Sequence, residues 1–495
     1  MLRVIEHYVT RSIGDRHGTQ RSTPFCETEA MATPPARLDD DRLDALTSET
    51  VELLQALIRN RCVNDGTEAS GEEIRNADVL QQVIEGAGVD VERYEAAPGR
   101  ASIVARIAGT NPNAPSLCLM GHTDVVPVNE SGWREDPFGG EIIDSGDGPE
   151  VWGRGAVDML NITASMAVAF RNLASGGFRP TGDLIYFGVA DEEAGSTYGA
   201  RWMADNHPDA IRADYVLTES GGLHSGPEDA SVVGINIAEK GVAWRRLRVR
   251  GTPGHGSAPF RGNNALVKAA GVIQRLADYR PAPRFHELWP ARVESLGVPD
   301  DLKAALLDPD AIDAALVALP KGHAAHFHAC THTTFSPNLI DGSESGGGRM
   351  KVNTIPDAVV IDVDVRTLPG EGPDDVDAHL RAALGELFDQ VEVEPLMNDA
   401  ASISRIDTPL WDSLQRAVNV PFPATRLSPQ FMVGFTDSRI YRELGAVSYG
   451  AGLFSPSLDA GAFGSRFHGN DERVDIESLA LTTRLWHDVA TDLLG

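Results

Sequence analysis

The sequence predicts an α/β fold with a mainly parallel sheet, into which a second, two-layer α+β domain is inserted. Between residues 89 and 236, short apolar runs alternate with loops and helical patterns, which is typical of a parallel sheet covered on both faces. From about residue 240 the pattern changes, and residues 243–250 alternate apolar and basic side chains as a strand with one exposed face does. The length of 495 residues also favours two domains over one.

The first domain opens with an amphipathic helix over residues 42–60, where leucines recur at helical spacing. A second helix is expected from Ser70, because Glu73 three residues later would complete a capping box. A short apolar strand then runs from Leu117 to Gly121. Further strands are expected at residues 89–94, 102–107, 183–190 and 214–218, and a helix at 159–174.

The inserted domain is expected to span residues 240–395. It should contain a loop at 251–259, a helix at 264–278, an irregular segment at 285–330 with a helical patch near 309–319, strands at 351–353 and 358–366, and a helix at 373–388. The first domain would thus comprise residues 41–239 and 396–495, with its last part formed by a helix at 411–418, a strand at 446–449 and a helix at 476–494.

Composition and charge narrow the class of protein. The net charge of −29 argues against binding to nucleic acid or to anionic membranes, and no apolar run approaches the roughly 18 residues of a membrane-spanning helix. The four cysteines have no paired spacing, which predicts reduced thiols in a cytoplasmic protein. Residues 1–40 have no apolar core of a signal peptide, so we expect a disordered extension there.

Several predicted strands end on residues that can bind metals. The strand at Leu117 is followed by His122 and Asp124, and a histidine at a strand end can offer one ring nitrogen to a metal while an aspartate holds the other. Taken alone, such a His-x-Asp sequence is an ordinary turn. The next strands run into Glu192-Glu193 and into Glu219. Each of these has a simple alternative as a solvated loop residue.

Taken together, these residues predict a metal centre. Asp158 precedes the helix at 159–174 and taken alone would be an N-cap. Carboxylates that converge on one rim repel one another, and divalent cations remove that repulsion. Two cations would also hold a water molecule between them and lower its pKa. His468, in the C-terminal segment, can supply the second nitrogen ligand, and a set of nitrogen and oxygen ligands suits Zn²⁺ or a related ion.

At this point the sequence resembles the M20 family of dinuclear zinc aminoacylases, carboxypeptidases and deacylases. The resemblance extends over residues 42–490 and its motifs occur in the family's order. They are Gly121-His-Thr-Asp-Val-Val-Pro127, Gly153-Arg-Gly-Ala-Val-Asp158, Asp191-Glu-Glu-Ala-Gly195, Thr218-Glu-Ser220, Gly254-His-Gly-Ser257, Val352-Asn-Thr-Ile-Pro356, Asp364-Val-Arg366, Thr436-Asp-Ser-Arg439 and His468-Gly-Asn-Asp-Glu472.

The resemblance implies a role for each of these residues. His122 and Glu219 would bind one metal, Glu193 and His468 the other, and Asp158 would bridge them. Asp124 would orient His122, and Glu192 would be the general base. His255 would reach across a homodimer, formed through the inserted domain, to stabilise the oxyanion. Arg366 and Asn353 would hold the substrate carboxylate, with Arg439 a weaker candidate. Two divalent ions are implied, most simply zinc, with cobalt or manganese as alternatives.

The activity implied is hydrolysis of the amide bond of an N-acyl amino acid or small peptide with a free carboxylate. A carboxypeptidase or a biosynthetic desuccinylase or deacetylase is the alternative within enzymes, and a catalytically silent binding protein is the alternative from another class. The chain departs from the family's pattern at Leu160-Asn161, where many relatives have Lys-Gly. That departure bears on contacts with the substrate rather than on the metals.

Overall fold

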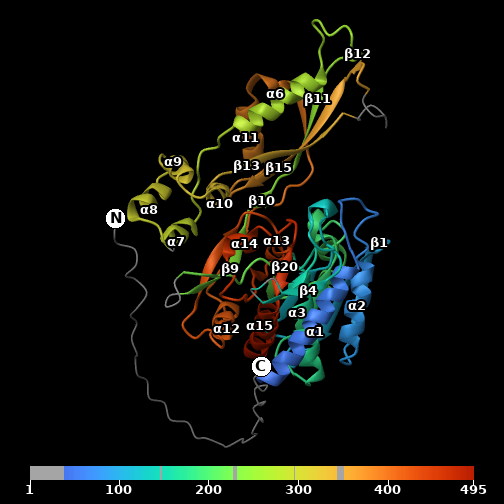
Figure 1. Cartoon of the computed structure of the whole chain (residues 1–495), viewed down its shortest axis with the longest axis vertical. Coiled ribbons are helices and arrows are strands. Elements are labelled where there is room, and N and C mark those ends of the chain that lie inside the picture. Colours follow the sequence, from blue (N-terminus) through green and yellow to red (C-terminus); the bar gives the residue numbers. More distant parts are fainter. Residues whose placement is uncertain (1–37, 145, 147, 227–230, 295, 343–350) are drawn as a thin grey trace, which may run out of the picture. The chain divides into compact units, whose positions relative to one another are not determined.

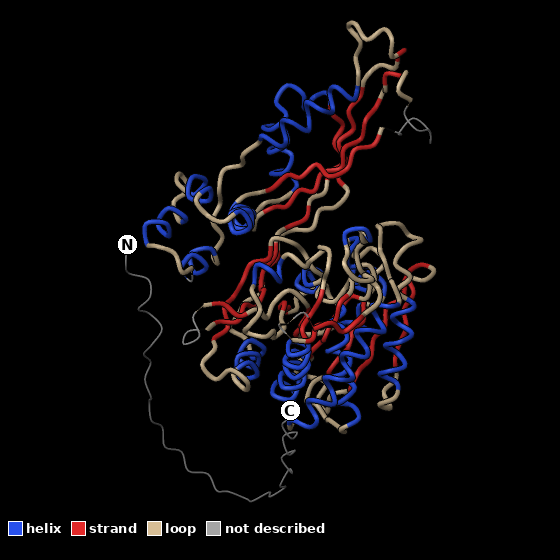
Figure 2. Tube along the Cα trace, viewed as in Figure 1, coloured by secondary structure: helices blue, strands red, loops and turns tan. Residues whose placement is uncertain are grey.

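A computed structural model of the chain describes residues 38–144, 146, 148–226, 231–294, 296–342 and 351–495. The extension expected at residues 1–40 lies almost entirely outside the described residues. Figures 1 and 2 show helices and strands arranged as an α/β protein. No helix in the described ranges is both long enough and apolar enough to cross a lipid bilayer.

The larger sheet has ten strands, in the order β1-β2-β6-β3-β7-β19-β9-β17, with β8 and β18 also paired to β9. Its four middle strands, β6, β3, β7 and β19, are parallel to one another, whereas the pairs at the flanks are antiparallel except β18 with β9. The predicted parallel sheet is therefore confirmed at its centre. The strands are β1 (Val91–Ala97), β2 (Arg100–Ile107), β3 (Leu117–His122), β6 (Leu184–Val189), β7 (Tyr215–Thr218), β8 (His224–Ser225), β9 (Val232–Glu239), β17 (Ser402–Ile403), β18 (Arg426–Met432) and β19 (Val447–Gly450).

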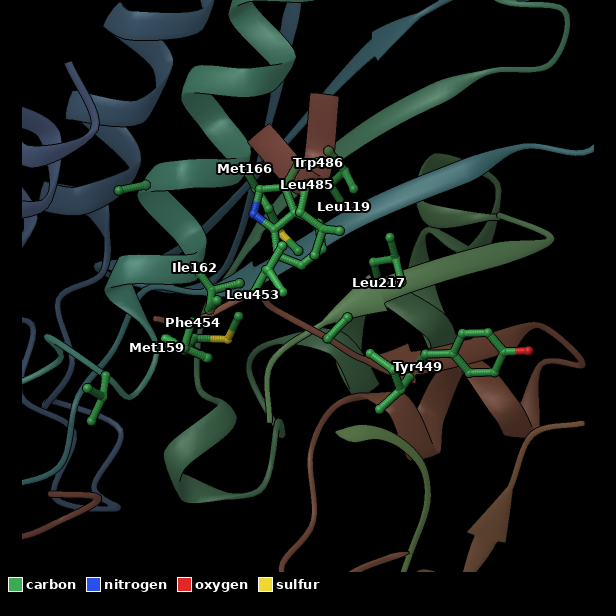
Figure 3. Packing of buried hydrophobic residues seen from close by; sticks show 14 of the residues in the cluster. Leu119, Met159, Ile162, Met166, Leu217, Tyr449, Leu453, Phe454, Leu485 and Trp486 are labelled. Carbon is green, nitrogen blue, oxygen red and sulfur yellow. The ribbon is translucent and has the colours of Figure 1, made fainter. Parts of the chain in front are cut away.

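Helices cover both faces of this sheet. On one face, α1 (Asp40–Arg59), α3 (Leu160–Ser175) and α15 (Ile476–Leu494) pack together, and Figure 3 shows Met166 and Trp486 of two of these helices near Leu119 of β3. On the other face, α4 (Ala200–Asn206) and α13 (Ser438–Glu443) cover residues that include Cys118. Alternate residues of β3 thus enter two separate cores, which explains why the strand is apolar throughout.

The helix expected from Ser70 begins later. Helix α2 (Ile74–Glu85) has Glu73 as its N-cap residue, but the Glu73 side chain makes no capping hydrogen bond. Instead, both carboxylate oxygens of Glu73 accept hydrogen bonds of 2.7 Å from the buried guanidinium of Arg100. The predicted capping box is therefore wrong, because a buried ion pair in the tertiary structure uses the carboxylate.

A second sheet of five strands has its own core. Its order is β10-β15-β11-β16, with β13 paired to β15, and all pairs are antiparallel. Two helices, α6 (Ala265–Asp278) and α11 (Pro373–Leu384), pack on it around residues such as Leu247, Ile361 and Leu380. The strands are β10 (Gly241–Val242), β11 (Arg245–Arg250), β13 (Thr334–Asp341), β15 (Ala358–Thr367) and β16 (Val391–Pro395). Because the chain passes from β9 to β10 and from β16 to β17, we keep 240 and 395 as proposed domain boundaries.

The segment at 285–330 is more helical than expected. It contains α7 (Trp289–Glu294), α8 (Asp300–Leu306), α9 (Ile312–Val317) and α10 (Lys321–Thr331). Helix α9 confirms the helical patch expected near residues 309–319. Helices α7 and α8 have only six and seven residues, too few for an apolar period to stand out in the sequence. Formation of the helices in this segment depends on burial of side chains such as Trp289 and Phe327.

Likewise, the strand expected at residues 351–353 is a turn. The short strand β14 (Thr354–Ile355) follows it and pairs with β12 (Gly254–His255).

Candidate metal centre

The three adjacent strands β6, β3 and β7 bring the predicted ligands to one edge of the sheet. His122 is the last residue of β3 and is paired with Val189 of β6. Glu192 and Glu193 follow β6 in a turn of 3₁₀ helix, and Glu219 follows β7 directly. Because the carboxyl ends of parallel strands lie at the same edge, residues distant in sequence meet there.

Two clusters of potential ligands form at this edge and share one residue. The first cluster is His122, Asp158 and Glu219, and the second is Asp158, Glu193 and His468. Within each, the ligand atoms lie within 4.8 Å of one another. One carboxylate oxygen of Asp158 is 3.3 Å from Nε2 of His122, and its other oxygen is 3.1 Å from Nε2 of His468. Glu193 approaches the same nitrogen of His468 at 3.1 Å.

The clusters concentrate negative charge in a buried place. Burial, followed by the charge of Asp158, raises the pKa of Glu219 well above its usual range. Hydrogen bonds to Asp158 and Glu193 raise the pKa of His468 to about 10. Without cations, therefore, a proton on the imidazole balances part of the negative charge. A divalent cation that takes the place of this proton can bind both the imidazole and the carboxylates.

The residues present fit divalent cations. Oε1 of Glu193 is buried and has no hydrogen-bond partner within the described residues, although a buried carboxylate oxygen normally has one. Glu219 is 5% exposed, and the hydrogen bond that it accepts comes from Ser220 rather than from a cationic side chain. Imidazole nitrogens and carboxylate oxygens are the ligands that Zn²⁺ and its neighbours accept.

Asp124 supports both sides of the centre. Its backbone oxygen lies 3.0 Å from Nδ1 of His122, and its carboxylate lies 3.5 Å from the same nitrogen. The carboxylate also accepts the backbone N–H groups of Glu192 and Glu193 at 3.3 and 3.2 Å. Asp124 therefore fixes the orientation of His122 and of the turn that carries the two glutamates.

Glu472 supports the loop that ends in Asp158. Its buried carboxylate accepts the backbone N–H groups of Val157 and Asp158 at 2.8 and 3.0 Å and pairs with Arg154 at 2.6 Å. Sequence reasoning gave Glu472 no role beyond its place in the His468 motif. The sequence signal that could have identified Glu472 is its position in this motif, four residues after the predicted ligand His468.

A cavity of about 510 Å³ opens onto the two clusters. Arg366 lines it, and its guanidinium donates to Asp364 at 2.7 Å and lies over the ring of Phe435 at 4.7 Å. Its Nη1 is buried and lacks a hydrogen-bond partner within the described part of the chain. A ligand carboxylate could satisfy this nitrogen. Apolar residues that sequence reasoning missed form much of the wall, namely Leu223, Trp244, Met432, Phe435, Phe454, Phe463 and Phe467.

His122 and Asp124 do not line this cavity themselves, and neither do three of the residues predicted to contact the substrate. The Arg439 guanidinium binds Asp399 at 2.7 Å and the backbone oxygen of Thr436 at 2.7 Å, which gives it a structural use. His255 and Asn353 are exposed and lie close together at the antiparallel β12–β14 pair, where Gly256 N donates to the Asn353 oxygen at 2.8 Å. Neither belongs to the cavity wall of the same chain.

The fold and the centre together define a class of protein, namely α/β proteins with a metal site at the carboxyl ends of parallel strands. Comparison with known proteins makes the class specific. The model of peptidase family M20/M25/M40 matches residues 118–492, and the chain belongs to this family. It is therefore a member of a family of metal-dependent hydrolases that act on amide bonds.

The individual relatives and solved structures share only modest sequence identity with this chain. A probable carboxypeptidase S-like protein of Dictyostelium discoideum is 25% identical over 76% of this chain and 71% of its own length. Mouse aminoacylase-1 is 34% identical, but the match covers 40% of this chain and 46% of the relative, so the chain spans less than half of it. The dipeptidase Dug1p of Saccharomyces cerevisiae has the same fold, with a TM-score of 0.67, 15% identity and coverage of 92% and 97%.

Proposed function

We propose that this protein hydrolyses the amide bond of an N-acyl amino acid or small peptide with a free carboxylate, and that it uses two divalent ions, most simply Zn²⁺. The observation that carries the proposal is Asp158, whose two oxygens face histidines of different clusters. A carboxylate in this position can bind two cations at once. The other ligands would be His122 and Glu219 for one ion and Glu193 and His468 for the other.

When bound, the two ions would polarise the amide carbonyl and make a water molecule acidic enough to attack it. Glu192 is suited to move the proton. The residue is 6% exposed, and its carboxylate lies 4.0 Å from Nε2 of His122. Burial, followed by the charge of Glu219, raises the pKa of Glu192 well above the usual range. A carboxylate with a raised pKa can take the proton from water and return it to the leaving nitrogen.

Arg366 is proposed to bind the free carboxylate of the substrate. Its buried Nη1 needs an acceptor, and Asp364 fixes the opposite side of the guanidinium through 2.7 and 3.2 Å hydrogen bonds. A charged hydrogen bond of this kind contributes about 1.5–3 kcal/mol. The guanidinium therefore selects substrates that carry a carboxylate near the scissile amide.

The Arg366→Met variant should raise KM about 10- to 100-fold, as expected from the loss of such a bond. Its effect on kcat should be smaller, because the contact is present before and during the reaction. Arg246→Met is the matched control, since Arg246 pairs with Asp362 at 2.8 Å on the same sheet and does not line the cavity. Steady-state kinetics would contradict the role if Arg366→Met left KM unchanged.

The exposed positions of His255 and Asn353 support a homodimer in which each chain completes the other's cavity. His255 would stabilise the oxyanion and Asn353 would contact the carboxylate of a substrate held by the partner. Both lie at the β12–β14 strand pair, so a single interface between two chains could bring both residues to the partner's cavity. Nδ1 of His255 is 2.7 Å from the hydroxyl of Ser257, which leaves Nε2 to meet a substrate.

Mixed dimers test this proposal. His255→Ala and Glu192→Gln should each reduce activity strongly when expressed alone. When the two variants are co-expressed, a mixed dimer has one site with Glu192 and the partner's intact His255, so activity should return. The measurement is the rate of the purified mixed species. Absence of recovery in confirmed mixed dimers, or full activity of a monomer, would refute the exchange of His255.

The amide hydrolase proposal itself is tested by screening N-acetyl, N-succinyl and dipeptide substrates with metal-reconstituted protein. Chelator-sensitive hydrolysis of one class identifies the activity, and a carboxypeptidase or a desuccinylase would show in the same screen. A protein that loads metal but hydrolyses none of these substrates would instead support the catalytically silent binding protein.

A further inference from the structure

A separate group of metal-ligating side chains lies in the helical segment that follows α6. Asp313 is in the first turn of α9, and His328 and His332 are at the C-terminal end of α10 (both helices are labelled in Figure 1). Their ligand atoms lie within 4.8 Å of one another. We call this group the helix cluster; none of its residues lines the cavity at Asp158.

His332 has the orientation of a metal ligand. Its side chain is 1% exposed, and its Nδ1 is 3.1 Å from the backbone oxygen of His328 and 3.0 Å from the hydroxyl of Thr331. Because that hydroxyl donates to the backbone oxygen of Phe327, it accepts from His332. Both neighbours of Nδ1 are therefore acceptors, which places the ring proton on Nδ1 and a lone pair on Nε2.

Nε2 of His332 faces a carboxylate without a hydrogen bond between them. Its Nε2 is buried and has no hydrogen-bond partner among the described residues, yet Oδ1 of Asp313 is only 3.2 Å away. Two acceptors at this distance repel each other unless a proton or a metal ion lies between them. Two ligand atoms at tetrahedral positions around Zn²⁺ are about 3.3 Å apart, since each lies about 2.0–2.1 Å from the ion. The observed separation matches this value.

His328 adds the second nitrogen ligand. It precedes His332, the C-cap residue of α10, by four residues, the spacing of two zinc-binding histidines in a known helical motif. Its ring stacks on that of His332, with centroids 4.1 Å apart and planes at 3°. The ring is only partly buried, so the side chain has room to rotate and direct a nitrogen at the space between His332 and Asp313.

We propose that Asp313, His328 and His332 bind a divalent cation of the zinc type, with water as a further ligand, and that this ion ties α9 to the end of α10. Two imidazoles and one carboxylate suit Zn²⁺, Co²⁺ or Ni²⁺. The site is structural. The backbone oxygen of His332 accepts from Lys240 at 2.6 Å, and β13 begins two residues later with Thr334, whose register partner is Arg366. The ion thus stabilises the chain that leads to the strand beside Arg366.

The test is metal content, measured by mass spectrometry after equilibration at micromolar free zinc. Asp313→Asn and His328→Gln should each bind one zinc ion per chain fewer than the wild type. Asp313 is largely exposed, so its substitution leaves the core intact. His323→Gln is the matched control, because His323 is an exposed histidine of the same helix outside the cluster. It should bind as much zinc as the wild type.

The comparison with the wild type does not depend on the Asp158 clusters, because none of the three variants alters them. If those clusters bind no zinc, the proposed function fails but the difference of one ion remains. If the helix cluster is only a stacked histidine pair beside an acidic first turn of a helix, all four proteins bind equal amounts of zinc. Equal contents, or a difference seen only at millimolar zinc, would overturn the proposal.

Discussion

Glu192→Gln should keep the metal content of the wild type and lower kcat by about 10²–10⁴-fold, the range that a positioned general base contributes. The amide is close to the carboxylate in size but cannot accept the proton of the attacking water. Because Glu192 belongs to neither cluster, its neutralisation leaves the ligand set complete. Steady-state rates and metal analysis of the same preparation measure both quantities.

Glu193→Gln provides the comparison, since Glu193 is its neighbour in the same turn but belongs to the second cluster. This variant should lose metal as well as activity. Near-normal turnover of Glu192→Gln would exclude Glu192 as the base. Loss of metal from Glu192→Gln would instead make it a ligand.

Asp158→Asn should have the second large effect. Each cluster contains two carboxylates, and Asp158 is one of them in both. The substitution therefore removes a negative charge from both clusters at once, beside His122 on one side and His468 on the other. We expect metal affinity to fall for both ions together and hydrolysis to fall to background. Loss of a supporting partner typically costs 10–100-fold in metal affinity, and loss of a shared ligand should exceed this.

Titration calorimetry of the metal-free protein with zinc measures this effect. Asp183→Asn is the control, because Asp183 is a partly buried aspartate at the opposite end of β6 that pairs with Arg106. It should keep both binding events even if its stability falls. If Asp158→Asn weakened only one of two zinc-binding events, Asp158 would not be shared.

Local patterns in the sequence were sufficient to predict the central strands of the sheet and the acidic residues at their carboxyl ends. The apolar run at Leu117 and the residues that follow β6 and β7 could be assigned without tertiary information, because a strand buried on both faces has a continuous apolar pattern. The final helix was predicted with the bounds it has, Ile476–Leu494. The five proposed ligands came from the same reasoning and the family resemblance, and the structure places them within reach of one another.

Features that depend on distant contacts could not be predicted in this way. The capping box at Ser70 looked correct locally, yet Glu73 is engaged by Arg100, which lies 27 residues away. Helix α9 lies in the helical patch expected near residues 309–319, but α7, α8 and α10 were not predicted, and neither was the helix cluster.

The sequence by itself determined the family, the strands that end in acidic residues and the identities of the candidate ligands, because these follow from local patterns and from motif order. Only the tertiary structure decided that Asp158 faces two histidines at once, that Arg366 presents a buried nitrogen to the cavity and that His332 faces Asp313. The physical reason is that a strand pattern fixes which residues lie at a sheet edge, whereas the direction of each side chain depends on hydrogen bonds and packing from residues far away in the chain.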